Sequence, residues 1–359
     1  MEKKKFIVAC GGTGGHTFPG LAVARELQSR GHEVVVWASG RSIEGSVMKS
    51  WEGPVFSTGA KPLSAKNALS NVFSILRCRR EMKRFAPDAL LAMGSYSSLP
   101  PVLAAKAHHV PVILHEANTV PGRAVDFLAR YAKMVAISFA ETVDHLKGRP
   151  TELTGLPVRS EIAGQPRFDE VPADAFTVFV TGGSQGAHRV NVLTSQALVL
   201  VKSELEQRLD NRRRLFVIHQ TGAADEEAVR KRYQVAGIPA RVNAFEREMG
   251  RAFTTADLVV CRAGASTCFE LALVGKPAFF IPLPSAMRDH QHFNALAFVK
   301  RGAADEGTQE SLTPRSIANY ILHKFDSPAS LAQKAEAMKK SAQPQAAAKV
   351  ADIVERLAR

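Results

Sequence analysis

Two glycine-rich segments of this chain are suited to holding an anion close to the backbone. The first, Gly11-Gly12-Thr13-Gly14-Gly15-His16, follows the apolar run Lys5–Cys10, and the second, Gly182-Gly183-Ser184-Gln185-Gly186-Ala187, follows Phe176–Thr181. Glycine lets the backbone approach a ligand closely, and the start of a helix offers unpaired N–H groups to an anion. The repeat predicts two similar α/β domains facing one cleft, one of which holds a phosphate. The alternative is that both segments are only tight strand-to-helix turns.

Neither segment is one of the two common phosphate-binding loops. A P-loop needs Gly-x-x-x-x-Gly-Lys-Ser/Thr, and neither segment supplies the lysine. The dinucleotide fingerprint needs Gly-x-Gly-x-x-Gly, but Thr17 stands where its third glycine belongs. That fingerprint also needs an acid at the end of the second strand, where Trp37-Ala38-Ser39 stands instead. The sequence therefore argues against a dehydrogenase.

The elements that must position these segments alternate along the chain. Apolar strands separated by helices indicate a buried parallel sheet, and the pattern restarts after a proline-bearing stretch at 165–172. A length of 359 residues predicts two domains, at 1–157 and 158–343, with a terminal helix at 344–359 that packs back on the first. A helix is expected over Pro19–Ser29, with proline in its first turn. Strands are expected at 33–38, 89–93, 110–114, 216–219, 241–245, 258–261 and 278–281.

Composition narrows the class of protein. The chain is 45% apolar and 23% charged, which is ordinary for a globular protein, and it has neither a bilayer-spanning run nor a signal-peptide core. We therefore expect it in the cytoplasm, with its four cysteines reduced because they show neither pairing nor metal spacing. The net charge of +13 suits nucleic acid, an anionic membrane or anionic substrates. No zinc-finger, basic-zipper or aromatic-rich basic pattern supports nucleic acid as a partner.

Further motifs follow in order along the chain. They are His115-Glu116-Ala117-Asn118, Pro157-Val158-Arg159, Cys261–Thr267 with Glu270, and Asp289-His290-Gln291. Together with the two glycine segments, this ordered set resembles the MurG family over nearly the whole chain. Members of that family are GT-B glycosyltransferases that transfer N-acetylglucosamine from a UDP donor to a lipid-linked muramyl-pentapeptide.

The resemblance implies an α/β fold of two Rossmann-like, doubly wound parallel-sheet domains facing a cleft. The first domain would bind the acceptor and an anionic membrane surface, and the second would bind UDP-N-acetylglucosamine. It implies an inverting transfer without a cofactor, in peptidoglycan synthesis, cell-wall biogenesis, cell shape and cell division. The implied location is peripheral, at the cytoplasmic face of the cell (inner) membrane. Two alternatives stay open: a GT-B transferase acting on another lipid-linked acceptor, and a non-catalytic nucleotide-sugar-binding protein.

The same resemblance assigns substrate-binding positions. It implies this role for Thr13, Gly14, Gly15, Asn118, Arg159, Ser184, Gln185, Glu246, Ala265, Ser266, Thr267, Cys268, Phe269, Glu270 and Gln291. No Asp-x-Asp occurs in the chain, so the charge of the leaving diphosphate must be met by the glycine turn and Arg159 rather than by a metal. Ser184 and Gln185 have helix capping as their alternative. Glu270 is assigned to the ribose, and its alternative is to complement a helix start.

Two residues are candidates for the general base. Histidine as a residue type titrates near neutral pH, which makes His16 a candidate for base catalysis, although it could instead only hydrogen-bond substrate or steady its loop. Glu116 is a rival base.

A basic amphipathic segment precedes residue 85. Leu69, Val72, Phe73 and Leu76 have helical spacing, and five basic residues follow within the next two turns. Such a segment suits the surface of an anionic bilayer. The alternative is an ordinary helix whose apolar side lies in the core.

Four positions depart from the family pattern. Ser95 stands where the family has glycine, Ala117 where it has glutamine and Leu156 where it has asparagine. Glu246 replaces an apolar residue beside the expected uracil site, where the expected contact comes from the backbone. Ser95 adds a side chain on the acceptor side, where close backbone approach is expected.

Overall fold

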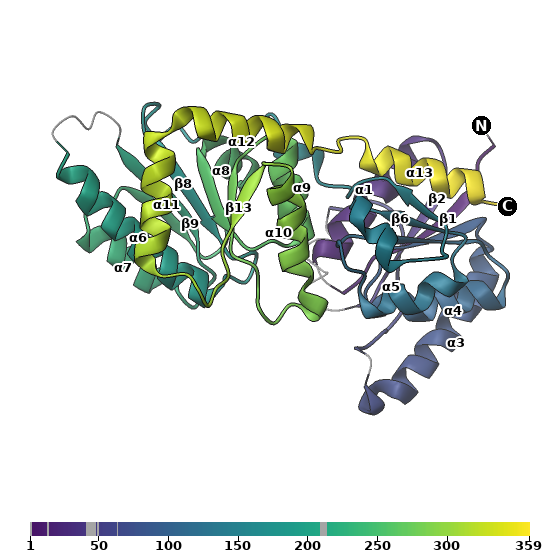
Figure 1. Ribbon diagram of the computed structural model, residues 1–359. Coiled ribbons are helices and arrows are strands. Elements are labelled where there is room, and N and C mark those ends of the chain that lie inside the picture. Colours follow the sequence, from purple (N-terminus) through teal and green to yellow (C-terminus); the bar gives the residue numbers. More distant parts are fainter. Residues whose placement is uncertain (1, 13, 41–47, 49, 63, 209–213) are drawn as a thin grey trace. The chain divides into compact units, whose positions relative to one another are not determined.

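The computed structural model describes residues 2–12, 14–40, 48, 50–62, 64–208 and 214–359 (Figure 1). The chain divides into two compact units, one formed by residues 1–159 with 343–359 and the other by residues 160–342. The division falls two residues beyond the boundary that we expected from the sequence. Arg159 therefore lies in the first unit rather than in the second.

The first unit is built on a seven-stranded parallel sheet in the order β3-β2-β1-β4-β5-β6-β7. Its strands are β1 (Lys5–Ala9), β2 (Glu33–Ala38), β3 (Val55–Ser57), β4 (Ala89–Ala92), β5 (Val112–Glu116), β6 (Met134–Ile137) and β7 (Thr151–Leu153). Its α-helices are α1 (Gly14–Ser29), α3 (Ala68–Phe85), α4 (Leu99–Ala107), α5 (Arg123–Leu128) and α13 (Ala346–Leu357). Short 3-10 helices are η1 (Ala65–Asn67), η2 (Tyr96–Ser98), η3 (Ala129–Tyr131) and η4 (Ala140–His145).

Helices cover both faces of this sheet, because its strands are apolar on both sides. One face packs against α1 and α13 through residues such as Leu21, Leu27 and Val354. The other face packs against α3, α4 and α5 through residues such as Cys78 and Val102. The unit is therefore doubly wound, as continuous apolar strands predict.

The terminal helix α13 is part of the first unit, and in Figure 1 it runs, in yellow, beside α1. Its own residues Val350, Ile353 and Val354 are fully buried. At its edge, Glu355 accepts a hydrogen bond from Arg30 at 2.7 Å, and its other oxygen lies 2.7 Å from the His32 ring nitrogen. This apolar face with its polar rim attaches the end of the chain to the first sheet.

The second unit repeats the plan with a six-stranded parallel sheet, in the order β10-β9-β8-β11-β12-β13. Its strands are β8 (Phe176–Thr181), β9 (Leu215–Gln220), β10 (Ala240–Asn243), β11 (Leu258–Cys261), β12 (Ala278–Phe280) and β13 (Ala304–Glu306). Its α-helices are α6 (His188–Glu206), α7 (Glu226–Val235), α8 (Met249–Thr255), α9 (Ala265–Val274), α10 (His290–Lys300), α11 (Pro314–Asp326) and α12 (Pro328–Lys340), with 3-10 helices η5 (Ser160–Ile162) and η6 (Met287–Asp289).

Both sheets have the strand order of a Rossmann fold, so the fold class predicted from the sequence is confirmed. In each sheet the order reverses beside its first strand, between β1 and β4 and between β8 and β11. Ligands of open α/β sheets bind at this switch point, outside the carboxyl ends of the strands. Each glycine segment follows the strand at its switch point.

Some expected boundaries are wrong. Helix α1 begins at Gly14, so Pro19 lies inside it rather than in its first turn, and the first glycine segment runs directly into the helix. Strand β5 begins two residues later than expected, because Pro111 has no N–H to give to the ladder. The four cysteines are buried free thiols.

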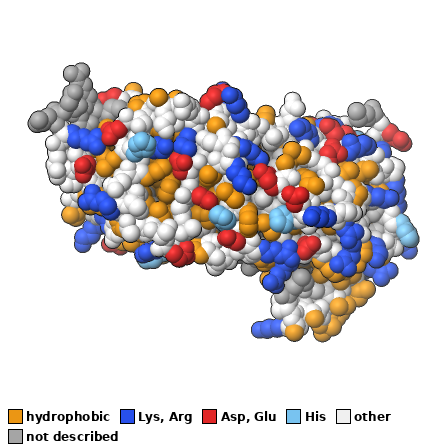
Figure 2. Space-filling model, in the orientation of Figure 1, with side chains coloured by type: hydrophobic (Ala, Val, Ile, Leu, Met, Phe, Trp, Pro, Cys, Tyr) orange, Lys and Arg blue, Asp and Glu red, His pale blue; other side chains and the backbone are white. Residues whose placement is uncertain are grey.

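Helix α3 turns polar side chains inward. The buried Asn71 side chain bonds both backbone groups of Lys61, and the Ser74 hydroxyl donates to the Thr58 carbonyl. The opposite side exposes the apolar stripe Leu69 (69%), Val72 (50%), Phe73 (63%) and Leu76 (54%). Figure 2 shows apolar side chains gathered over this part of the molecule. The expectation of an ordinary helix with this stripe in the core is therefore wrong. Among the described residues, no helix has the length and apolarity needed to cross a bilayer.

Candidate active site

The glycine turn after β8 requires glycine at defined positions. Gly183 and Gly186 have positive φ angles, of +92° and +76°, and the Gly186 N–H donates to the Gly183 carbonyl at 2.9 Å. A Cβ added to Gly186 would lie 1.9 Å from the carbonyl oxygen of Thr221. Conversely, a Cβ on Gly222 would lie 2.3 Å from the Gln185 carbonyl oxygen. The turns after β8 and β9 therefore lie backbone to backbone, and no side chain fits between them.

Side chains of neighbouring strands hold this turn in place. The Gly183 N–H donates to Thr181 Oγ1 at 3.1 Å, and Gln220 Nε2 donates to the Gly183 carbonyl at 2.7 Å. Sequence reasoning gave no role to Gln220. Its place at the carboxyl end of the strand beside β8 is the signal that could have found it.

A buried polar network lies under the turn. Asn191 Nδ2 donates to the Thr221 carbonyl and to Asp225, while Asn191 Oδ1 lies 3.1 Å from His219 Nε2. Burial lowers the pKa of His219 to about 3, so its ring is neutral, and its Nδ1 lies 2.8 Å from the Tyr233 hydroxyl. This network fixes the start of α6 against β9, which keeps the glycine turn in one conformation.

Ser184 and Gln185 lie at the exposed tip of the turn. The N-cap of α6 is Ala187, and no side chain caps the helix. Helix capping, the alternative role for these two residues, is therefore wrong. Within the described part of the chain, neither side chain has an internal hydrogen-bond partner, so both are available to a ligand.

Helix α9 contributes a second stretch at the same edge of the sheet, directly after β11. Gly264 is its N-cap, and Ala265, Ser266 and Thr267 form its first turn. Glu270 is the sixth residue of the helix and is buried, so it does not complement the helix start as the alternative expected.

The side chains of Cys268 and Phe269 lie in the core, 0% and 3% exposed, and the Phe269 ring packs edge-on against Phe298. Of the candidates in α9, Ser266 and Thr267 are therefore the polar side chains that remain partly exposed.

The side chain of Glu246 is used inside the protein. It accepts hydrogen bonds from Arg241 Nε, from Asn243 Nδ2 and from the Glu248 N–H, each at 2.9 Å. Burial alone would raise the pKa of Glu246, but these bonds outweigh it and hold the pKa below its usual value. The carboxylate of Glu246 is therefore already bound within the protein.

Gln291 lies in the first turn of α10, at the carboxyl-end side of the second sheet. Its Oε1 accepts a hydrogen bond from the Leu283 N–H at 3.0 Å. Two consecutive residues before the helix, Arg288 and Asp289, have left-handed backbone conformations. This turn and the Leu283 bond set the direction of the Gln291 amide.

In the first unit, Gly14, Gly15 and His16 form the first turn of α1, while Thr13 lies outside the described residues. His16 is half-buried, and a Cβ on Gly94 would lie 3.7 Å from its Cδ2. Burial, with a smaller effect of nearby His16, lowers the pKa of His115 to about 4. His16 thus lies at the switch point, beside the loop that follows β4.

Glu116 lies at the end of β5 and closes the loop that follows. Its Oε1 accepts from the backbone and side chain of Asn118, at 2.8 and 3.2 Å, and its Oε2 accepts from the Gly122 N–H at 3.0 Å. Burial raises its pKa to about 7. Three N–H groups thus already occupy the two oxygens of the rival base.

Arg159 stacks on the first unit. Its guanidinium carbon lies 4.6 Å from the centre of the Phe18 ring, on α1. The structure therefore places Arg159 in the first unit, against α1.

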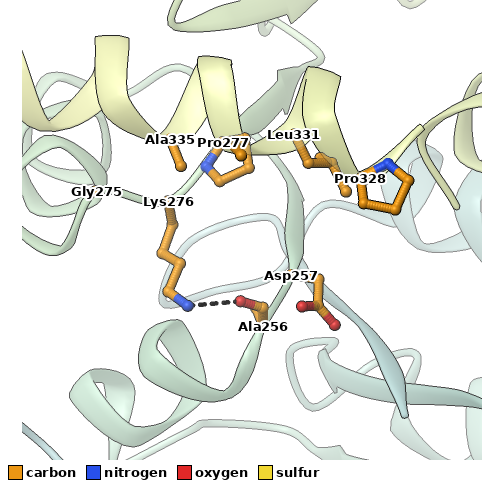
Figure 3. A pocket seen from close by; sticks show the side chains of 9 residues that line it. Ala256, Asp257, Gly275, Lys276, Pro277, Pro328, Leu331 and Ala335 are labelled. Carbon is orange, nitrogen blue, oxygen red and sulfur yellow. Dashed lines mark hydrogen bonds between the residues drawn. The ribbon is translucent and has the colours of Figure 1, made fainter. Parts of the chain in front are cut away.

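A cavity of about 260 Å³ lies at the opposite edge of the second sheet, before β11 and β12 and beside α12. In Figure 3, Lys276 points away from α12, and its ammonium donates to the Ala256 carbonyl and also to that of Thr254, at 2.8 and 2.9 Å. This lysine therefore supports the end of α8 and lies outside the candidate site. Among the described residues, no cluster of His, Cys, Asp or Glu is arranged to hold a metal ion.

The fold and the two glycine turns define a GT-B glycosyltransferase, and comparisons with known proteins agree. Residues 6–137 match the model of the glycosyltransferase family 28 N-terminal domain, and residues 177–357 match that of its C-terminal domain.

Relatives named UDP-N-acetylglucosamine–N-acetylmuramyl-(pentapeptide) pyrophosphoryl-undecaprenol N-acetylglucosamine transferase are similar over nearly the whole chain. The one from Geobacter metallireducens is 38% identical over 97% of each chain. That from Anaeromyxobacter sp. (strain K) is 35% identical over 99% of this chain and 93% of its own. The chain therefore belongs to glycosyltransferase family 28 and, within it, to the family of these transferases.

Solved structures agree with this assignment. The crystal structure of Acinetobacter baumannii MurG has a TM-score of 0.79 and 30% identity, and covers 99% of this chain and 100% of its own. A Neisseria meningitidis UDP-GlcNAc 2-epimerase bound to UDP-GlcNAc has a TM-score of 0.72 over 98% of this chain and 100% of its own. At 13% identity, this second likeness concerns the fold alone.

Proposed function

We propose that this chain transfers N-acetylglucosamine from UDP-N-acetylglucosamine to the muramyl 4-hydroxyl of undecaprenyl-pyrophosphoryl-N-acetylmuramyl-pentapeptide, with inversion, in peptidoglycan synthesis. The observation that carries the proposal is the similarity to transferases named for this activity, at 34–38% identity over 88–99% of the chain. The glycine turn of the second unit supports it, because a rigid, exposed turn before a long helix suits a diphosphate.

The second unit would bind the donor. In this proposal the backbone of residues 182–186 and the side chains of Ser184 and Gln185 receive the diphosphate. Thr267 at the start of α9 would lie near the same group, Glu270 would bind the ribose, and Gln291 would bind the sugar hydroxyls. The exposed tip of the turn and the partly exposed Thr267 support these roles.

His16 is the proposed general base. The acceptor oxygen attacks the anomeric carbon from the face opposite the diphosphate, and His16 takes the hydroxyl proton. The new C–O bond forms as the bond to the phosphate oxygen breaks, and UDP leaves with that electron pair. Inversion of the α-linked donor gives a β linkage. His16 is preferred over Glu116 because three N–H groups already bind the Glu116 oxygens.

The test is incubation with UDP-N-acetylglucosamine and a short-chain, lipid-linked muramyl-pentapeptide, with the disaccharide product measured. We expect His16→Ala to lower kcat by about 10²–10⁴-fold with donor affinity unchanged. The exposed His145 in the same unit provides the control, His145→Ala, which should keep full activity. Donor binding without product in the parent protein would favour a nucleotide-sugar-binding protein. An unchanged kcat in His16→Ala would remove His16 from this role.

We also propose that α3 attaches the protein to an anionic membrane. Its exposed stripe of Leu69, Val72, Phe73 and Leu76 lies before the exposed basic residues Arg77, Arg79, Arg80, Lys83 and Arg84. Apolar side chains can enter the headgroup boundary, and each basic residue near an anionic surface contributes about 1 kcal/mol. An acceptor anchored by a polyprenyl chain would require the enzyme to work at this surface.

Vesicle co-sedimentation tests the membrane proposal. The variant Arg79/Arg80/Arg84→Glu should lose most binding to anionic vesicles, and Leu69/Phe73→Ser should lose binding at high salt as well. A control with the same change of charge, Lys300/Arg315/Lys340→Glu, replaces exposed basic residues of the second unit and should bind as the parent does. Equal binding by the parent and the α3 variants would show that this helix is not the anchor.

A further inference from the structure

The first residue of α6, His188, carries an exposed ring beside the glycine turn of the second unit. Its side chain is 77% exposed, and its Nδ1 lies 2.7 Å from Oδ1 of Asp225. His188 follows Gly186 by two residues. Because the Cα–Cβ bonds of a helix tilt toward its N-terminus, a side chain at this position leans toward the glycine turn. The ring is thus held close to the turn that is proposed to receive the diphosphate of the donor.

The contact with Asp225 fixes which ring nitrogen of His188 carries the proton. Burial alone would raise the pKa of Asp225, but hydrogen bonds from Asn191 and His188 outweigh it and hold the pKa below its usual value. An ionised carboxylate only accepts hydrogen bonds, so Nδ1 of His188 donates to it. In the neutral ring Nε2 is therefore a bare acceptor, and only the protonated ring carries a second N–H, on Nε2.

Protonation of His188 therefore reverses what its ring offers to an anion. When the ring is neutral, Nε2 presents a lone pair, and the ring and Asp225 together carry one negative charge. When the ring is protonated, the pair is neutral overall, and Nε2–H can donate a charge-assisted hydrogen bond to a phosphate oxygen. Histidine as a residue type changes between these two forms near neutral pH. The pair can thus convert a change of pH into a change of affinity for an anion.

The other ionisable groups that face this end of α6 keep one charge state near neutral pH. His219, under the turn on β9, is neutral because burial lowers its pKa to about 3. The remaining groups are carboxylates and basic groups, whose residue types titrate far from neutral pH. They are Arg189 on α6 and Glu226, Glu227, Arg230, Lys231 and Arg232 on α7. Helix α11 also packs against α6, and it meets the far end of that helix, where Arg315 pairs with Glu204.

We propose that the His188–Asp225 pair couples donor binding to proton uptake. The protonated ring of His188 donates a hydrogen bond from Nε2 to a diphosphate oxygen of the nucleotide sugar, and the neutral ring does not. The inference rests on the proposed transferase function, and it adds regulation by pH to the donor site. Because the bound anion stabilises the protonated ring, a protein whose ring is neutral takes up a proton from the solvent as the donor binds.

Isothermal titration calorimetry with UDP-N-acetylglucosamine tests this coupling. This ligand is suitable because its diphosphate has no terminal phosphate, whereas a terminal phosphate, as in UDP, titrates near pH ~6. Binding is measured rather than the rate of transfer, because the proposed base His16 also gains a proton during turnover. We expect Kd to rise about 10-fold from about pH 6 to about pH 8, the loss of one charge-assisted hydrogen bond. Heats measured near pH ~7 in two buffers of different ionisation enthalpy should show net proton uptake.

Three substitutions at exposed positions separate the charge of the ring from its place in the structure. His188→Arg carries a permanent positive charge, so its Kd should stay close to the tight value of the parent at low pH over the whole range. His188→Gln carries no charge and should bind the donor as weakly as the parent does at high pH, whatever the pH. The control His323→Gln makes the same change at an exposed histidine of α11 and should keep the pH dependence of the parent.

Two results would overturn the coupling. One is a parent protein whose Kd for the donor does not change with pH, and the other is a His188→Gln protein that keeps the pH dependence. Failure of the proposed function is seen separately. A parent protein that binds no donor at any pH would refute the transferase proposal itself, whereas donor binding and transfer without pH dependence of Kd would leave that proposal standing and refute only the coupling.

Discussion

The contact between the turns after β8 and β9 makes a sharp prediction for two glycines of one loop. Gly183 and Gly186 both have positive φ, so alanine at either costs about 1–2 kcal/mol of backbone strain. A Cβ at Gly183 meets nothing within 4 Å, whereas a Cβ at Gly186 would lie 1.9 Å from the Thr221 oxygen and 2.6 Å from its carbonyl carbon. Only Gly186→Ala therefore forces backbone to move.

The loss of stability in Gly186→Ala follows from the hydrogen bonds that this movement of the backbone breaks. The backbone that must shift is tied to β10, because the Thr221 N–H donates to Asn243 at 3.0 Å and the Gly222 N–H donates to Ala244 at 2.9 Å. A buried group left without its partner costs about 1–3 kcal/mol. Gly186→Ala should thus cost about 2–5 kcal/mol in total, against about 1–2 kcal/mol for Gly183→Ala.

Thermal unfolding with and without UDP measures both effects. For a unit of this size, about 1 kcal/mol shifts Tm by about 2–4 °C, so Gly186→Ala should unfold about 10 °C lower than the parent. It should also lose most of the rise in Tm that saturating UDP gives, while Gly183→Ala should keep more of it. Equal losses in the two variants would refute the reasoning. Backbone strain, which both variants share, would then explain the whole loss, and the close contact between Gly186 and Thr221 would contribute nothing to it.

Three further predictions concern groups outside this turn. Burial raises the pKa of Glu116 from 4.5 to about 7, so the folded state keeps a proton that the unfolded state releases. Stability should therefore fall by about 3 kcal/mol as pH rises from about 4.5 to 7 in urea unfolding, and this fall should be absent in Glu116→Gln. Lys276→Met leaves two carbonyls at the end of α8 without their donor, which should cost about 2–4 kcal/mol of stability and lower Tm. The control Lys340→Met, at an exposed position, should leave Tm unchanged. Transfer should continue in excess EDTA, because the proposal meets the charge of the diphosphate with backbone N–H groups and side chains; loss of product in chelator would contradict it.

The sequence was sufficient for the order of elements and for the two turns. Apolar strands alternating with helices require a parallel sheet buried on both faces, and each unit is built on such a sheet. Glycine at 183 and 186 reports a backbone conformation directly, since no other residue adopts it without strain. These features depend on residues that are close together in the sequence, so the sequence alone is enough to predict them.

Other features depend on residues distant in the chain and could not be predicted. The orientation of α3 is set by Asn71 and Ser74 bonding to Lys61 and Thr58, which no helical pattern reports. The side chain of Glu246 is directed by Arg241 and neighbouring groups. The sequence predicts a helix start at Pro19, because proline is favoured in the first turn, but the helix begins five residues earlier, at Gly14.

The switch points of the two sheets share the same arrangement of strand, glycine-rich turn and helix, but they differ in how well they tolerate substitution. In the second unit the turn packs backbone against backbone, so a Cβ at Gly186 or Gly222 would meet backbone atoms that cannot rotate away. The side chains of Thr181 and Gln220 add hydrogen bonds to the same turn. In the first unit the loops after β1 and β4 are tied by hydroxyls, and the Ser97 bond to Gly11 is one example.

A Cβ added to Gly186 or Gly222 would meet backbone, whereas one added to Gly12 would meet first the hydroxyl of a serine side chain. Ser95 in the first unit has a strained backbone conformation that glycine favours, with a φ of +69°. The glycine turn of the second unit is therefore the less tolerant of substitution of the two.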